Sequence, residues 1–402
     1  MKHILYYCAI FLMGMATLTA CSSDDEVNPD NENTENNGND NNGGGNNNND
    51  KNDDDNDEPS SIKDTITIEY KGTSATVTIP SSANYVTCSS GTSADVVLTN
   101  TNVTDEIAYK VSGASSNGSL TINGDYKMAV ILNGVSLTST KGAALDIQCG
   151  KRINIIMADG STNTLVDAAG GSQKACLYTK GHIELSGAGT LNVSGNTNHA
   201  IAAKEYFQVK KSVKAINIVK AANDAIHVGQ HFQMNGGELN ITSTTANDGV
   251  QVDYKTDDYG NIIADEDNTG KVIIKGGTLN ITMAANQDSK GIKTEGDIII
   301  SGGTFNINVN SNGSRGMQAD GNMVIGEEDG STNITVCAAG SRCTMAEDAA
   351  DPHNCMGIKL DGDLTVNAGK VIVYNTGAKS KGIKVGGTYT KNGGDVMAVV
   401  EE

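Results

Sequence analysis

Apolar and polar residues alternate along most of the chain, and the alternating segments are short. Residues 231–234 and 238–241 are typical, with a Gly-Gly pair between them. Alternation at period two predicts half-buried β-strands, whereas an amphipathic helix would show a period of about 3.6 residues. The pattern therefore predicts an all-β protein.

The alternating segments recur at a fixed interval. One apolar position can be followed through eight repeats: Leu177, Ile201, Ile226, Val250, Ile292, Met317, Ile358 and Ile383. The steps are 24 or 25 residues, except for steps of 42 and 41 that contain insertions at residues 254–270 and around 338–354. A fixed period of this length predicts a solenoid.

Each repeat contains three alternating segments separated by turns, which predicts one triangular coil of a parallel β-helix. Stacked coils lie about 4.8 Å apart, so that each apolar column is buried against itself. We expect about nine coils of three strands, with residues 142–402 forming the main β-helix domain. Residues 61–141 alternate without a clean period, and we expect an N-terminal β cap and the first coil there.

The first 60 residues have a different character. An apolar run ends in Leu18-Thr19-Ala20-Cys21, which predicts a signal peptide over residues 1–20. Residues 21–60 carry 13 acidic residues and one lysine among Asn, Gly and Ser, which predicts a disordered linker. This linker contributes −12 (1 − 13) of the net charge of −19, so the remainder is mildly acidic and we expect no nucleic-acid partner.

The junction at Cys21 resembles the lipobox of bacterial lipoproteins, in which the cysteine is acylated. The resemblance implies that a lipid on Cys21 is the only membrane contact. The following Ser22-Ser23-Asp24-Asp25-Glu26 resembles the surface-export signal of lipoproteins in the Bacteroidetes. Together they imply an outer-membrane lipoprotein that faces the cell surface. The alternatives are a plain secretory signal and an acidic cluster that only begins the linker.

Several repeats share short motifs. Asn223-Asp224, Asn247-Asp248, Lys290-Gly291 and Lys381-Gly382 each precede a strand, and several coils close with Gly-Gly-Thr/Glu-Leu/Phe-Asn-Ile. Over residues 62–402 this order resembles the carbohydrate-binding β-helix family first recognised in cellulolytic clostridia, a non-catalytic relative in shape of the pectate and polygalacturonate lyases. The resemblance implies a right-handed parallel β-helix that binds acidic or plant-type polysaccharide, with calcium among its ligands.

The residue after each buried aliphatic position predicts an outward column, because side chains alternate along a strand. Its candidate carbohydrate-binding residues are Tyr178, His227, Gln251, Lys293, Gln318, Lys359 and Lys384. Two residues further along each repeat, a second column holds Lys204, Asp253, Glu295, Asp320 and Asp361. Such rows suit the hydroxyls and carboxylates of an extended glycan. Alternatively, they are polar only because a β-helix exterior faces water.

Aromatic side chains are few, so recognition would be mainly polar. The chain has no tryptophan and four phenylalanines, which makes a flat aromatic platform improbable. Tyrosines expected to be exposed, such as Tyr178, Tyr254 and Tyr259, are the rings that could stack against a sugar.

Asp224 and Asp248 occupy equivalent positions before consecutive strands, so we expect them to stack, with Asp253 close by and Asp320 along the same edge. Adjacent carboxylates repel unless a cation neutralises them, and calcium takes six to eight oxygen ligands. These four aspartates are therefore candidate calcium ligands. Capping of the turns by Asx hydrogen bonds is an equally good explanation.

Candidate catalytic groups are scarce. Lys290, Arg315 and Lys381 recur at one place in the repeat, which indicates a repeated surface role rather than a unique base. The sequence thus favours a non-catalytic polysaccharide-binding protein, which we expect to be monomeric. A polysaccharide lyase on the same scaffold and an adhesive or structural solenoid are the alternatives.

Histidines and cysteines show no metal-site spacing. Adjacent coils carry His199, His227 and His231 with no matching third ligand, so we expect these histidines to be surface residues. In an oxidising compartment, three cysteines are close enough in sequence for one disulfide of undetermined pairing: Cys337, Cys343 and Cys355.

Overall fold

The computed structural model describes residues 61–243, 245–284, 287–326, 331–345 and 348–401. The predicted signal peptide, Cys21 and the acidic linker lie outside these residues. All described residues belong to one compact unit, Asp53–Glu402. Its regular structure is β-strand apart from a short 3-10 turn, η1 (Ser81–Ala83). In the part described, no helix is long and apolar enough to cross a membrane.

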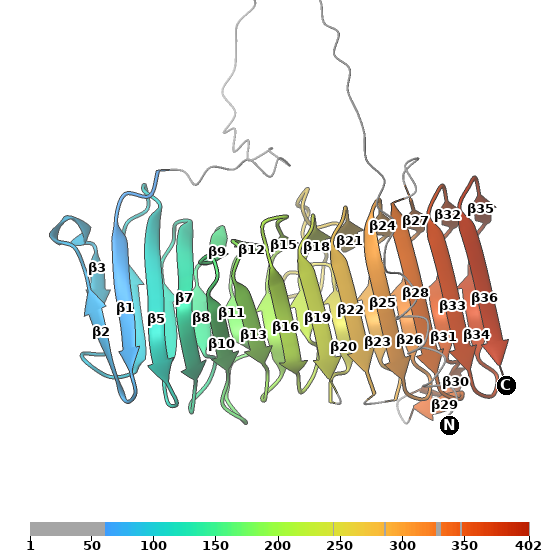
Figure 1. Ribbon diagram of the computed structural model, residues 1–402, viewed down its shortest axis with the longest axis horizontal. Helices are drawn as coiled ribbons and strands as arrows, with labels where there is room; N and C mark the ends of the chain where they lie inside the picture. Colours follow the sequence, from blue (N-terminus) through green and yellow to red (C-terminus); the bar gives the residue numbers. More distant parts are fainter. Residues whose placement is uncertain (1–60, 244, 285–286, 327–330, 346–347, 402) are drawn as a thin grey trace, which may run out of the picture. The chain divides into compact units, whose positions relative to one another are not determined.

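Three stacks of parallel strands run along this unit (Figure 1). The first stack contains β4 (Asp95–Asn100), β6 (Ser119–Asn123), β8 (Leu145–Gln148), β11 (Ala175–Thr179), β14 (His199–Ala203), β17 (Ile226–Val228), β20 (Asp248–Val252), β23 (Lys290–Thr294), β26 (Arg315–Ala319), β31 (Met356–Leu360) and β34 (Lys381–Val385). The second contains β9 (Ile153–Met157), β12 (Ile183–Ser186), β15 (Phe207–Val209), β18 (His231–Met234), β21 (Lys271–Ile274), β24 (Ile298–Ile300), β27 (Met323–Ile325), β32 (Leu364–Val366) and β35 (Tyr389–Lys391). The third contains β10 (Thr162–Val166), β13 (Thr190–Ser194), β16 (Ala215–Lys220), β19 (Glu238–Ser243), β22 (Thr278–Met283), β25 (Gly303–Asn310), β28 (Thr332–Ala339), β33 (Lys370–Thr376) and β36 (Asp395–Glu401).

One strand from each stack forms one coil, and nine such coils follow one another from β8–β10 to β34–β36. Leu177 pairs with Ile201, Ile201 with Ile226, and the same column continues in register to Ile383. The first insertion lies between β20 and β21, and the second contains a hairpin of β29 (Cys343–Met345) and β30 (Asp348–His353). The predicted all-β parallel β-helix with three strands per coil is confirmed.

The N-terminal strands are already part of the helix. Strands β1 (Thr65–Lys71) and β2 (Ser74–Thr78) are antiparallel, as are β3 (Val86–Cys88) and β4. In contrast, β5 (Ile107–Ser115) and β7 (Met128–Thr138) are parallel, and β7 pairs with both β9 and β10. Two coils, β4–β5 and β6–β7, therefore precede β8, where we expected one. Their long strands cross the corner between the second and third stacks, which hides the repeat in the sequence.

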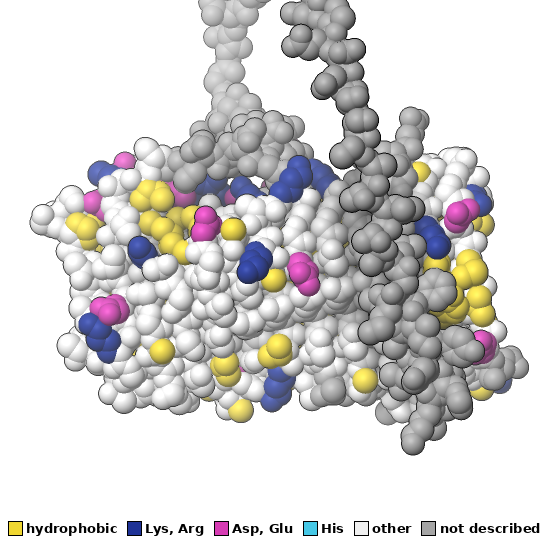
Figure 2. All heavy atoms as spheres, viewed as in Figure 1, with side chains coloured by type: hydrophobic (Ala, Val, Ile, Leu, Met, Phe, Trp, Pro, Cys, Tyr) yellow, Lys and Arg dark blue, Asp and Glu magenta, His cyan; other side chains and the backbone are white. Residues whose placement is uncertain are grey.

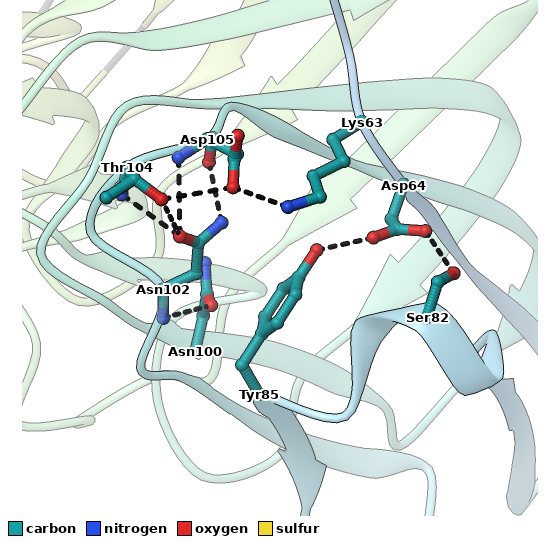
Figure 3. Close-up of polar contacts among 8 residues, drawn as sticks. All are labelled: Lys63, Asp64, Ser82, Tyr85, Asn100, Asn102, Thr104 and Asp105. Carbon is teal, nitrogen blue, oxygen red and sulfur yellow. Dashed lines mark hydrogen bonds and ion pairs between the residues drawn. The ribbon is translucent and has the colours of Figure 1, made fainter.

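Polar side chains close the N-terminal end (Figure 3). Asp64 accepts hydrogen bonds from the Ser82 hydroxyl and the Tyr85 hydroxyl, both at 2.5 Å. Lys63 Nζ lies 2.7 Å from Asp105 in the loop between β4 and β5. These contacts tie the segment before β1 to that loop, so the terminal coil is fixed where a solenoid would otherwise end in an open edge.

The third stack carries a ladder of hydrogen-bonded asparagines. Asn217 donates to Asn192 and Asn240 to Asn217, each at 2.9 Å. Asn280 and Asn306 continue the ladder at 2.8 Å per step. Figure 2 views this side and shows few, scattered charged side chains over its uncovered part. This face is therefore held by its own amide network.

Small residues line the corner where the third stack turns into the first. The residue before the buried aliphatic position is successively Cys176, Ala200, Ala225, Gly249, Gly291, Gly316, Gly357 and Gly382. A Cβ on Gly316 would lie 2.0 Å from Val336 Cγ1, and one on Gly291 would lie 2.5 Å from Ile307 Cγ2. Aliphatic side chains of the third stack therefore occupy the space that a larger residue here would need.

Replacing Gly316 with alanine should lower the free energy of unfolding by about 1–3 kcal/mol, because the core must make room for the new methyl group. Denaturant unfolding would measure the loss. Gly150→Ala is the matched control, since a Cβ at Gly150 meets nothing within 4 Å. Combining Gly316→Ala with Val336→Ala should cost less than the sum of the two changes. Equal stability of Gly316→Ala and Gly150→Ala would contradict the packing argument.

Candidate functional site

The candidate carbohydrate-binding residues form one physical row along the first stack. Tyr178 pairs with Ala202 and Ala202 with His227. From His227 the consecutive pairings lead to Gln251, Lys293, Gln318, Lys359 and Lys384. The row is therefore continuous, with Ala202 as its one apolar member between Tyr178 and Lys384.

Exposure differs along this outward column. Tyr178 is only 5% exposed and Gln318 only 9%, whereas Lys384 is exposed. Tyr178 packs with Ala175 and Ala202 outside the main core, so the expectation of an exposed ring at Tyr178 was wrong. Tyr254 is half-buried, and Tyr259 in the first insertion is 91% exposed. The column therefore offers polar groups rather than an aromatic surface.

Residues of the second column pair with those of the outward column within a coil. Gln251 Nε2 donates to Asp253 Oδ1 at 2.9 Å, and Lys359 Nζ lies 3.2 Å from Asp361 Oδ1. Lys293 and Lys384 have no ion pair among the described residues. Two lysine charges on this face are thus available to an anionic ligand.

Residues at the starts of the first-stack strands form a different, largely buried column. In order along the solenoid this strand-start column contains His199, Asp224, Asp248, Lys290, Arg315, Met356 and Lys381. All of these except Lys381 are buried. The structure therefore stacks a row of ionisable side chains between coils, away from the open surface.

The strand-start column is linked by hydrogen bonds from backbone to side chain. The backbone N–H of Asp224 donates to His199 Nδ1 at 3.3 Å, and that of Asp248 donates to Asp224 Oδ1 at 3.2 Å. Lys290 N–H donates to Asp248 Oδ1 at 2.8 Å. Asp224 and Asp248 do stack in neighbouring coils, and each accepts a hydrogen bond from the following coil.

Two histidines surround the carboxylate of Asp224. Its Oδ2 lies 3.2 Å from His199 Nδ1 and 3.0 Å from His227 Nδ1. The two imidazole rings stack with centroids 4.4 Å apart. Burial alone would raise the pKa of Asp224, but the hydrogen bonds from His199 and His227 outweigh it and lower the pKa to about 2. Asp224 is therefore ionised at any ordinary pH.

Asp248 has the opposite character. It is fully buried, and its Oδ2 has no hydrogen-bond partner among the described residues. Burial raises the pKa of Asp248 to about 6, against the attraction of Lys290 and with repulsion from Asp224. Neighbouring aspartates thus differ in pKa because only one of them has histidine partners.

Lys290 and Arg315 are neutralised by a shared carboxylate. Asp288 lies 2.7 Å from Lys290 Nζ and 2.6 Å from Arg315 Nη1. Burial opposes ionisation of Asp288, but these two cations hold its pKa below the usual value. The paired cations are therefore buried and structural, so the expectation of a repeated surface role was wrong for Lys290 and Arg315.

The four candidate calcium ligands do not converge on one point. Asp224 and Asp253 lie at opposite nitrogens of the His227 ring, with Asp253 Oδ2 3.4 Å from Nε2. Asp320 is exposed and belongs to a coil beyond that of Glu295. These side chains therefore do not fit the all-oxygen cage that calcium prefers.

One group of potential metal ligands does occur among the described residues. Ligand atoms of His199, Asp224 and His227 all lie within 4.8 Å of one another. Sequence reasoning found the two histidines but lacked a third ligand, because Asp224 was assigned to the aspartate set. The available signal was spacing: Asp224 lies 25 residues after His199, which is one coil, and three before His227.

The carboxylates of the first insertion accept hydrogen bonds from the turns of the insertion and from the neighbouring coil. Asp257 Oδ1 accepts the backbone N–H groups of Tyr259 and Asn261, each at 2.9 Å. Asp265 Oδ2 accepts a hydrogen bond from Gln230 at 3.1 Å. The insertion is thus held by Asx-type turns and docked on a neighbouring coil.

Cys343 and Cys355 are thiols rather than partners in a disulfide. Cys343 Sγ lies 3.5 Å from the Asn312 carbonyl, and Cys355 Sγ lies 3.4 Å from the Ser314 hydroxyl. The structure therefore has no bridge between these two cysteines.

An open groove lies on the second stack, away from the outward column. Ile299, Val324, Asn367 and Asn392 line it, and its volume is about 740 Å³. None of its described lining residues is charged, so these residues lack the groups that would orient an anionic sugar.

The fold and the outward column together define a parallel β-helix with one extended polar face, an arrangement suited to a long repetitive ligand. The chain belongs to the carbohydrate-binding domain-containing protein family, whose family model matches residues 97–401. The protein is thus a member of a carbohydrate-binding family, as the resemblance of its repeats implied.

Two relatives extend this comparison. A carbohydrate-binding domain-containing protein of Acetivibrio thermocellus is 28% identical over 111 residues, which cover 25% of this chain and 39% of that protein. The match therefore spans well under two thirds of the relative. A polysaccharide lyase-like protein from C. thermocellum, determined as a gadolinium derivative, has a TM-score of 0.52 at 22% identity, covering 67% of this chain and 99% of that chain. At this identity the likeness shows the fold alone.

Replacing Asp248 with asparagine should raise the free energy of unfolding at pH 7.5 by about 1–3 kcal/mol. The folded-state pKa of about 6 exceeds the usual 3.8, so the folded protein binds the proton more tightly and the wild type loses stability as pH rises from about 4 to 6. The gain should disappear below pH 4. Urea unfolding of both proteins from pH 3.5 to 8 would measure it, and a pH-independent difference would contradict it.

Proposed function

We propose that this chain is a non-catalytic surface lipoprotein that binds acidic or plant-type polysaccharide along the outward column. The observation that carries the proposal is the unbroken register of that column on a member of a carbohydrate-binding family. A glycan lying along the solenoid axis from His227 to Lys384 passes one polar position of the column in each coil, of which Gln318 is nearly buried. The repeated coils of the protein would thus contact the repeated sugar units of the ligand.

The charge pattern favours an anionic glycan. Lys293 and Lys384 have no ion-pair partner among the described residues, while the Gln251 amide is already hydrogen-bonded to Asp253. An exposed ion pair is worth only about 0.2–1 kcal/mol, so affinity would come from several weak contacts along the row. Binding of this kind depends on glycan length and on salt concentration.

The proposal assigns no step to calcium. Asp224 accepts a hydrogen bond from a backbone N–H group, and Asp224 and Asp253 both contact the His227 ring. The candidate aspartates therefore do not face one common cavity. A calcium requirement would therefore have to come from the sugar carboxylates or from backbone oxygens, not from this set of side chains.

The absence of catalysis is also part of the proposal. A lyase needs a basic side chain next to the substrate, and Lys290 and Arg315 are buried against Asp288. The lyase alternative draws on the fold likeness to a protein that is called polysaccharide lyase-like. An adhesive solenoid is the other alternative, and retention on a glycan array would separate it from a polysaccharide-binding protein.

Replacing both Lys293 and Lys384 with alanine should weaken binding of the full-length protein to polygalacturonate about 2- to 30-fold at low salt, since the charge contacts of half-buried Lys293 and exposed Lys384 are lost. Affinity electrophoresis or calorimetry would measure it. Lys214→Ala, an exposed lysine before β16 on the third stack, is the matched control and should bind like the wild type.

Incubation of the wild-type protein with polygalacturonate tests the proposal that the protein is non-catalytic. No unsaturated product should appear by ultraviolet absorbance, with or without calcium. Release of unsaturated oligosaccharide would establish the lyase alternative. Equal binding by the double variant and the wild type would contradict the proposal that the binding surface is the outward column.

The lipid anchor is proposed from Cys21. In the producing bacterium, Cys21→Ser should release the protein from the membrane fraction, because acylation needs the thiol. Fractionation with detection of the protein would measure this. Protease added to intact cells should remove the wild-type protein, and its full protection would contradict surface exposure.

A further inference from the structure

We propose that His199, Asp224 and His227 bind a divalent transition-metal ion of the zinc class. The site joins two neighbouring coils, since His199 begins β14 while Asp224 and His227 belong to the β17 coil. The proposal is independent of the polysaccharide ligand, which the exposed lysines further along the solenoid would contact.

The distances fit such an ion. Zinc binds histidine nitrogen and carboxylate oxygen at about 2.0–2.2 Å, which places neighbouring ligands of a tetrahedron roughly 3.3 Å apart. Asp224 Oδ2 lies 3.2 Å from His199 Nδ1 and 3.0 Å from His227 Nδ1. Binding of one ion by all three atoms would require the stacked imidazole rings to rotate until both Nδ1 lone pairs converge on it.

His199 Nδ1 faces both the backbone N–H and the carboxylate of Asp224. This ring nitrogen lies 3.3 Å from the backbone nitrogen of Asp224, so it accepts that N–H when it carries a lone pair and donates to the Asp224 carboxylate when it carries a proton. The same Nδ1 faces Asp224 Oδ2 at 3.2 Å. A lone pair facing a carboxylate oxygen is repulsive unless a proton or a metal ion lies between them.

An excess of negative charge surrounds the group. Asp248, in the next coil, is fully buried, and its Oδ2 has no hydrogen-bond partner among the described residues. Asp253 adds a third carboxylate on the outer side of His227. A divalent cation bound by His199, Asp224 and His227 would place positive charge next to these carboxylates.

Asp253 is positioned like a carboxylate that orients a metal-binding histidine. A histidine that binds a metal through one ring nitrogen usually donates its other N–H to a carboxylate. His227 faces Asp224 with Nδ1, and its Nε2 lies 3.4 Å from Asp253 Oδ2. Asp253 would therefore fix the tautomer in which Nδ1 is free to bind the ion.

The donor set selects among metals. Two imidazole nitrogens and one carboxylate suit zinc, copper, nickel or cobalt, whereas calcium and magnesium prefer oxygen. Three protein ligands leave the fourth position of a tetrahedron for water. The site thus differs in both ligands and chemistry from a calcium site built from aspartates.

Cobalt titration of the full-length protein, stripped of metal with a chelator, would test the proposal. We expect one equivalent of Co²⁺ with visible absorption typical of four-coordinate cobalt, and its displacement by Zn²⁺. His227→Ala and Asp224→Asn should abolish this absorption. His231→Ala, a histidine on the second stack, is the matched control and should retain it.

Thermal unfolding gives a second measurement. Zinc should raise the melting temperature of the wild type and of His231→Ala, but not of His227→Ala, since an ion that binds only the folded state stabilises it. His227 is half-buried, so this variant should fold even if Asp224→Asn does not. The proposal is overturned if stripped wild-type protein takes up no cobalt, or if His227→Ala shows the same spectrum and zinc response.

Discussion

The in-register stacking of one coil on the next is the constraint on which the rest of this structure depends. Each coil buries its aliphatic residues only against its neighbours, so no coil is stable alone. Parallel pairing then aligns equivalent positions, such as Ile226 with Val250 and Ile292 with Met317. A repeat in the sequence thereby becomes a set of straight columns, and each column acquires one physical role.

The columns could be predicted because the alternation and the period of apolar residues can be read directly from the sequence. The buried column from Leu177 to Ile383 follows from the repeat length, and the outward column consists of the residue that follows each of its members in the sequence. Exposure did not follow in the same way. Tyr178 is buried because Ala175 and Ala202 leave room for its ring, which depends on neighbouring coils rather than on the local pattern.

The strand-start column was the hardest part to predict. Its residues lie where the chain turns from the third stack to the first, and there the alternation of inward and outward positions is interrupted. The glycines next to them, Gly249 and Gly291, are required by third-stack side chains that approach within 3.2 Å of where a Cβ would lie. Sequence alone thus showed that Asp224 and Asp248 stack, but neither their burial nor the histidine partners of Asp224.

The order of charges in the strand-start column also restricts how the coils can align. Histidine and aspartates lie together, and the two cations that follow them share Asp288, so each charge has an opposite charge or a hydrogen bond nearby. The asparagine ladder, by contrast, is uniform and would tolerate a slip by one coil. A slip in this column would bury a carboxylate or an ammonium group without its partner, at a cost of several kcal/mol. The buried charges therefore favour one register in a solenoid whose apolar repeats are nearly interchangeable.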